Sequence, residues 1–141
     1  MPESPAAQIG YLLKETQSLL HTRMDEVLRP LGLTVPQYSC LLTLQQQPGI
    51  TSSELARRGF VSRQSMNVLL QSLADRGLVT RDDERGPRNQ LAAQLTPDAA
   101  DLLAEAQRGV ETVVTRMTSG MRAAQLTELR DALVDVRDRL A

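Results

Sequence analysis

The polar side chains between residues 62 and 71 are the part of this sequence best suited to chemistry. They are Ser62, Arg63, Gln64, Ser65, Asn67 and Gln71. The guanidinium fork of Arg63 matches the two acceptors on a guanine edge, and the amide of Gln64 or Asn67 can pair with adenine. The serine hydroxyls can donate to phosphate oxygens at the start of a helix. This pattern favours contacts to double-stranded DNA over the alternative, a capped and solvated helix end.

Two further groups of residues can add contacts to nucleic acid. Arg85, Arg88 and Asn89 lie in a polar stretch, and an arginine can enter the negative potential of a minor groove. The alternative there is a charge-balanced loop, because residues 82–84 are all acidic. Ser52 and Ser53 open an earlier helix, where they can either touch phosphate or cap that helix.

The sequence holds one histidine, His21, and one cysteine, Cys40. That excludes a zinc site with several His or Cys ligands and an intramolecular disulfide. There is also no catalytic triad and no phosphate-binding loop of the G-x-x-x-x-G-K type. We therefore expect no metal, no cofactor and no enzymatic role. Cys40 has no basic residue within several positions, which favours a buried structural thiol, and a redox-active Cys40 is the alternative.

These side chains must be positioned by helices, whose apolar residues recur at steps of three and four. Capping boxes are predicted at Thr34–Gln37 and Thr51–Glu54. The expected helices cover 6–31, 34–46, 52–58, 62–76, 97–118 and a final stretch through 126–140. A short helix, a tight turn and a capped second helix outline a helix-turn-helix, and strands over 78–81 and 91–95 enclose a basic loop. The predicted fold is mainly α with a small β-wing, a winged helix-turn-helix flanked by N- and C-terminal dimerisation helices.

The net charge of −1 argues weakly against nucleic acid, but the charge is unevenly spread. Residues 54–90 carry seven Arg and five acidic groups, a balance of +2, whereas the segments before and after are net negative. No run of apolar residues is longer than three, so we expect no membrane-spanning segment. Residues 1–5 lack a basic and apolar leader, which favours the cytoplasm.

The chain resembles the MarR family of bacterial transcription regulators in four segments. They are LGLTVPQY at 31–38, SELARR at 53–58, LADRGLV at 73–79 and LTP at 95–97. The family pattern places an arginine of the wing at Arg88. In the turn, Gly59 precedes Phe60, whereas the family usually has an apolar residue before the glycine. The resemblance implies a homodimer with a winged helix-turn-helix at 34–96 and an intertwined helical region formed by 1–33 and 97–141.

The two helical ends supply the residues expected at the dimer interface. They are Ile9, Leu12, Leu13, Leu126, Leu129, Leu133, Val136 and Leu140. The last five are spaced by 3, 4, 3 and 4, a short heptad seam that suits packing on a partner. The resemblance also implies a small phenolic or lipophilic effector, in a pocket that could include Tyr11, His21, Met24 and Tyr38. Ordinary core filling or helix-surface positions are the alternative for each of these four.

Three hypotheses follow. The favoured one is a homodimeric repressor, bound to a pseudo-palindromic operator and released by a small molecule that shifts the dimer population. The second is a regulator that binds DNA constitutively or senses oxidants through Cys40. The third is a winged-helix interaction module without DNA binding, whose behaviour would not change when Arg63 and Arg88 are both replaced by Ala.

Overall fold

The computed structural model describes residues 3–81 and 93–141. The helices are α1 (Pro5–Leu28), the 3-10 helix η1 (Arg29–Leu31), α2 (Val35–Gln46), α3 (Ser52–Arg58), α4 (Arg63–Asp75), α5 (Pro97–Met117) and α6 (Ala123–Leu140). Two short strands, β1 (Val79–Thr80) and β2 (Gln94–Leu95), complete the described part. The mainly helical fold with a small two-stranded wing is therefore confirmed.

The helix ends follow from local capping. Thr34 Oγ1 accepts from the Gln37 amide at 3.2 Å and Gln37 Oε1 accepts from the Thr34 amide at 3.0 Å, so this predicted capping box is confirmed. The second box is only half formed. Thr51 Oγ1 accepts from the Glu54 amide at 3.1 Å, but the Glu54 carboxylate pairs with Arg57 instead of returning to the Thr51 backbone. The carboxylate therefore forms an ion pair with the nearby Arg57 guanidinium and leaves the backbone amide of Thr51 without this cap.

The strands are shorter than predicted within the described residues. Val79 pairs with Leu95 and Thr80 with Gln94 in antiparallel register, so Leu78, Arg81 and Ala93 lie outside the ladder. Leu91 and Ala92, the start of the predicted second strand, fall outside the described residues. Thr96 closes the base of the hairpin, because its hydroxyl donates to the Gly77 carbonyl at 2.8 Å.

One apolar core joins α1, α2, α3, α4 and α5. Its fully buried large side chains are Leu28, Leu41, Leu55, Leu70, Leu73 and Leu103. No charged or polar residue is buried in the described part of the chain. Arg76, at the end of α4, donates to the Gly32 carbonyl at 2.6 Å. This bond fixes the end of α4 to the turn that follows α1 and η1.

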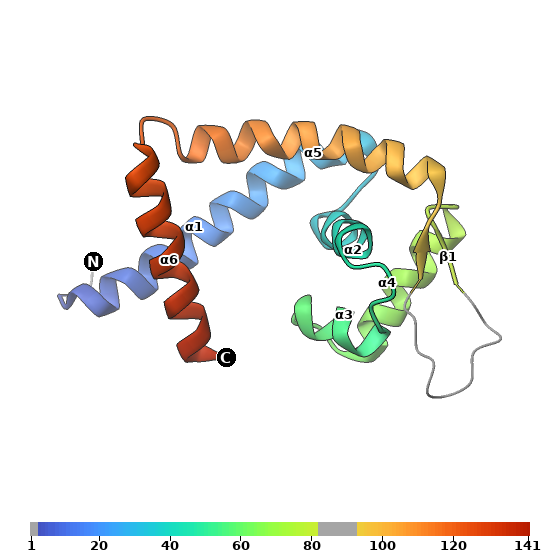
Figure 1. Cartoon of the computed structure of the whole chain (residues 1–141), viewed down its shortest axis with the longest axis horizontal. Coiled ribbons are helices and arrows are strands. Elements are labelled where there is room, and N and C mark those ends of the chain that lie inside the picture. The colour runs from blue at the N-terminus through green and yellow to red at the C-terminus, as the bar shows by residue number, and fades with distance from the viewer. Residues whose placement is uncertain (1–2, 82–92) are drawn as a thin grey trace.

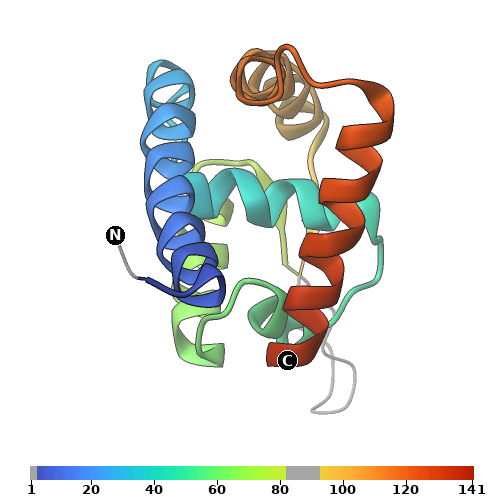
Figure 2. The same cartoon turned by 90° about the vertical axis from the view of Figure 1, so that its left-hand side faces the viewer.

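The last helix stands apart from this core. Figure 1 shows α5 crossing the top of the molecule and α6 descending on the side away from α4, and Figure 2 shows α1 and α6 on opposite sides of the view. None of the α6 side chains is buried. Among the helices of the described residues, none is long and apolar enough to cross a membrane.

Candidate nucleic-acid interface

Helix α4 presents a polar outer face from its first residue. Ser62 is its N-cap, and its hydroxyl accepts from the Ser65 amide at 3.0 Å. Ser62 also donates to the Ser65 hydroxyl at 3.0 Å, so the two serines are ordered by each other. Arg63, Gln64 and Asn67 are exposed, whereas Met66 and Leu70 are buried. This face can meet base edges while the opposite face holds the helix on the core.

A contact that the sequence did not predict ties α4 to the loop end of strand β1. Arg81, directly after β1, donates from Nη2 to Asn67 Oδ1 at 3.1 Å. The bond fixes the rotation of the Asn67 amide and places a second guanidinium beside the exposed face of α4. Farther along the helix, Gln71 donates to Asp75 Oδ1 at 2.9 Å, a bond within α4 that draws this amide away from the helix start.

Helix α3 supplies the second set of candidate contacts. Thr51 is its N-cap, so Ser52 and Ser53 occupy the first two helical positions, both half-buried. The side-chain hydrogen bond from Arg57 lowers the pKa of the Glu54 carboxyl, and the charges of Arg57 and then Arg58 act in the same direction. Glu54 therefore stays ionised and holds Arg57 directly, whereas Arg58 lies farther away, with its Nε 3.9 Å from Glu54 Oε1.

The predicted wing contacts Arg85, Arg88 and Asn89 lie outside the described residues. The described wing consists of the paired strands and Arg81, which follows β1 at the loop end of the hairpin. The candidate interface that the structure places is therefore the exposed face of α4, the start of α3 and Arg81.

Cys40 lies inside the core, with 3% of its surface exposed. Burial raises the pKa of its thiol to about 12, which keeps it protonated at physiological pH. We expect a disulfide reagent at pH 7.5 to react with the native chain at least about a hundredfold more slowly than with the urea-unfolded chain. Absorbance of the released thiolate measures both rates. Equal rates would restore the redox alternative.

A pocket of about 300 Å³ lies between α1 and the helices α2, α3 and α4. It is lined by His21, Val35, Pro36, Ser39, Cys40, Thr43, Leu55, Arg58, Gly59, Val61, Met66 and Leu69. Of the four predicted ligand residues, His21 is in this lining. Tyr38 is buried in the core, Met24 packs against the core, and Tyr11 is half exposed on α1.

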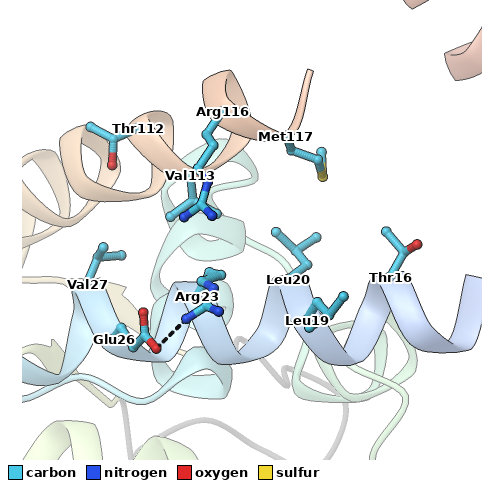
Figure 3. Close-up of a pocket in the computed structure, with 10 residues that line it drawn as sticks. All are labelled: Thr16, Leu19, Leu20, Arg23, Glu26, Val27, Thr112, Val113, Arg116 and Met117. Atoms are coloured by element: carbon cyan, nitrogen blue, oxygen red, sulfur yellow. Dashed lines mark hydrogen bonds and ion pairs between the residues drawn. The ribbon is translucent and has the colours of Figure 1, made fainter. Parts of the chain in front are cut away.

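A second pocket, of about 570 Å³, lies between α1 and α5. Figure 3 shows Leu20 on the α1 side of the pocket, with Val113 and Met117 on the α5 side. The ion pair of Arg23 and Glu26, 2.7 Å long, lies along the α1 side. Two of its apolar lining residues are largely exposed in the single chain, Leu19 at 61% and Met117 at 50%. An exposed apolar surface of this kind is typical of a site that another protein segment or a ligand covers.

The predicted interface residues are largely unpartnered within one chain. Ile9, Leu12, Leu126, Leu129, Leu133 and Leu140 are exposed, and Leu13 and Val136 are half-buried. On α6 they form one apolar face along the whole helix. Among the described residues, no group of three or more His, Cys, Asp or Glu side chains is arranged to hold a metal ion.

Comparison with known proteins gives matches over almost the whole chain. A model of the MarR family matches residues 31–88. The HTH-type transcriptional repressor Rv2887 of Mycobacterium tuberculosis is 36% identical over 127 residues, which are 90% of this chain and 91% of that protein. The crystal structure of Rv2887 in complex with DNA has a TM-score of 0.74 and 33% identity, covering 95% of this chain and 98% of that one. Its complex with salicylic acid has a TM-score of 0.69 and 35% identity, covering 90% and 96%.

Proposed function

Because the chain belongs to the MarR family, we propose that it is a DNA-binding transcriptional repressor that works as a homodimer and is released from its operator by a small molecule. The observation that carries the proposal is the start of α4. Exposed Arg63, Gln64 and Asn67 follow a capped helix end, while Met66 and Leu70 anchor the helix in the core. A relative with the same architecture has been crystallised with DNA.

The proposal assigns each part of the chain a role. Helix α4 enters the major groove with its N-terminal end leading, and Arg63 reads a guanine. Ser62 and Ser65 approach phosphates at the helix end, and Ser52 and Ser53 approach the backbone from α3. Arg88 and its neighbours Arg85 and Asn89 reach the adjacent minor groove. Residues 34–96 form the DNA-binding unit.

The homodimer is supported by the two apolar surfaces that one chain leaves uncovered. These are the heptad face of α6 and the groove between α1 and α5. We propose that residues 1–33 and 97–141 of two copies cover these surfaces for each other. The two α4 helices then lie in successive major grooves, about 34 Å or 10 bp apart on a pseudo-palindrome.

The effector site that best fits this scheme is the pocket beside His21. It is lined by residues of α1 in the dimerisation region and of α4 in the DNA-binding unit. A bound ligand can therefore favour one distance between the two α4 helices of the dimer over another. A relative has been crystallised with salicylic acid, which makes this aromatic acid the first probe. No residue in the proposed scheme has an enzymatic role.

The test is a titration of the full chain against the duplex that lies next to its own gene, at several salt concentrations. We expect tight binding that weakens steeply with salt, because phosphate contacts release counterions. Adding salicylic acid at fixed salt should release the duplex. Binding that is absent at low salt, from a chain shown to be a folded dimer, or that does not change with salt, would favour the interaction module instead.

A further inference from the structure

Three helical segments of this chain end with the same backbone hydrogen bonds. In each, a residue in the left-handed conformation donates to the third residue before it, and the next residue donates to the fifth residue before it, the Schellman pattern. The left-handed residues are Gly32 after η1, Phe60 after α3 and Gly77 after α4. Glycine suits this position because it has no Cβ. Among these three helix ends, that of α3 is therefore the exception.

At the end of α3 the glycine is one residue away from the position that needs it. Gly59 has φ −84° and ψ −2°, a conformation that any residue adopts. Phe60 has φ 55°, and 91% of its surface is exposed, so it contributes almost no packing. Exchanging the two residues would suit the backbone better. The glycine at 59 therefore needs an explanation other than chain conformation.

Space explains it. Gly59 lines the pocket of about 300 Å³ together with Leu55, Val61 and Met66. A Cβ on Gly59 would lie 3.5 Å from Met66 Cε and 3.7 Å from Val61 Cγ2, which is ordinary van der Waals contact. A methyl group therefore fits, whereas the branched end of a leucine would take up volume that is now empty.

We propose that Gly59 is a specificity-determining residue of the effector pocket, because the absence of a side chain there leaves the pocket open as far as Met66 of α4. This inference rests on the proposed function for the meaning of the pocket. The ligand class is a small aromatic carboxylate. Leu55, Val61 and Met66 offer apolar contact to a single ring. Arg58 offers a guanidinium to the carboxylate, and His21, Ser39 and Thr43 are further polar side chains in the lining.

Arg58 is available to a carboxylate because its intramolecular ion pair is loose. Its Nε lies 3.9 Å from Glu54 Oε1, whereas Arg57 makes the direct hydrogen bond to that carboxylate. A ligand anion near Arg58 thus competes with one distant contact only. Because Arg58 belongs to α3 and Met66 to α4, an occupant touches both helices of the helix-turn-helix.

The test measures salicylate binding to the dimeric chain by calorimetry, which does not depend on DNA. The variants are Gly59→Leu, Phe60→Gly and the two together. The double variant returns glycine to the left-handed position and so protects the fold if Gly59→Leu alone fails to fold. Thermal unfolding is recorded for all of them, and Phe60→Gly should raise the melting temperature by roughly 2–4 °C.

We expect the double variant to bind salicylate at least about tenfold more weakly than the wild type, because a leucine occupies the ring site. Phe60→Gly should bind it as the wild type does. Salicylamide, which has no carboxylate, should bind the wild type at least about tenfold more weakly than salicylate.

Wild-type affinity in the folded double variant would overturn the role of Gly59, and no salicylate binding by the wild type would overturn the ligand class. Absence of DNA binding beside intact salicylate binding would instead count against the proposed function alone.

Discussion

Replacing Arg63 by Ala should abolish selective binding to the operator while the chain stays folded. Arg63 is the first residue of α4 and is exposed, whereas Met66 and Leu70 of the same helix are buried. An arginine that pairs with a guanine edge contributes about 1–3 kcal/mol, so two copies in a dimer contribute about 2–6 kcal/mol. That corresponds to a loss of roughly 30-fold to 20,000-fold in affinity. Titration of labelled duplex at fixed salt measures the loss.

Arg108→Ala is the matched control for this substitution. Arg108 is an exposed residue of α5, outside the DNA-binding unit, and its removal changes the net charge by the same amount. We expect Arg108→Ala to bind within about threefold of the wild type, since a distant surface charge is screened by salt. Equal losses in the two variants would mean that Arg63 acts only through net charge. Thermal unfolding of both variants separates a binding defect from a folding defect.

Replacing both Leu129 and Leu133 by Asp should convert the dimer to a monomer. These residues lie on the apolar face of α6, 44% and 42% exposed in the single chain. A twofold interface would then bury four unpaired carboxylates, each costing at least about 1 kcal/mol, which raises the dimer dissociation constant by about a thousandfold or more. Operator affinity should fall with it, because one reading helix engages one half-site only. Analytical ultracentrifugation over a concentration series measures the association.

Thr127→Asp tests whether the position of the charge on α6 matters. Thr127 is exposed and lies on the opposite side of the helix from the heptad face, so it should leave the dimer intact. The double Asp variant should keep its helical circular dichroism, because α6 contributes no buried residue to the core. A double variant that remains a dimer would contradict the assignment of α6 to the interface.

The helix boundaries were predictable because their signals are local. Ser62 with Met66 and Leu70 predicts where α4 starts and which face it buries, and Thr34–Gln37 predicts the start of α2. The exposed face of α4 followed from the same pattern. Sequence reasoning was weaker at Glu54, where a capping role and an ion pair with Arg57 compete and only the structure shows that the ion pair forms.

Contacts between distant segments were not predictable from one sequence. The bond between Arg81 and Asn67 joins residues on either side of the end of α4, and the bond of Arg76 to Gly32 spans 44 positions. The left-handed conformation of Phe60 runs against residue preference, so no local rule identifies it. The burial of Tyr38, a candidate ligand residue, likewise depends on how α2 packs against its neighbours.

In the proposed complex, two α4 helices read successive major grooves of one operator. Methylation protection tests it most directly, because dimethyl sulfate attacks guanine N7, an acceptor in the major groove. We expect two groups of protected guanines about 10 bp apart, both lost in Arg63→Ala. Tight binding with no protected guanine in the major groove, or protection that persists in Arg63→Ala, would contradict it.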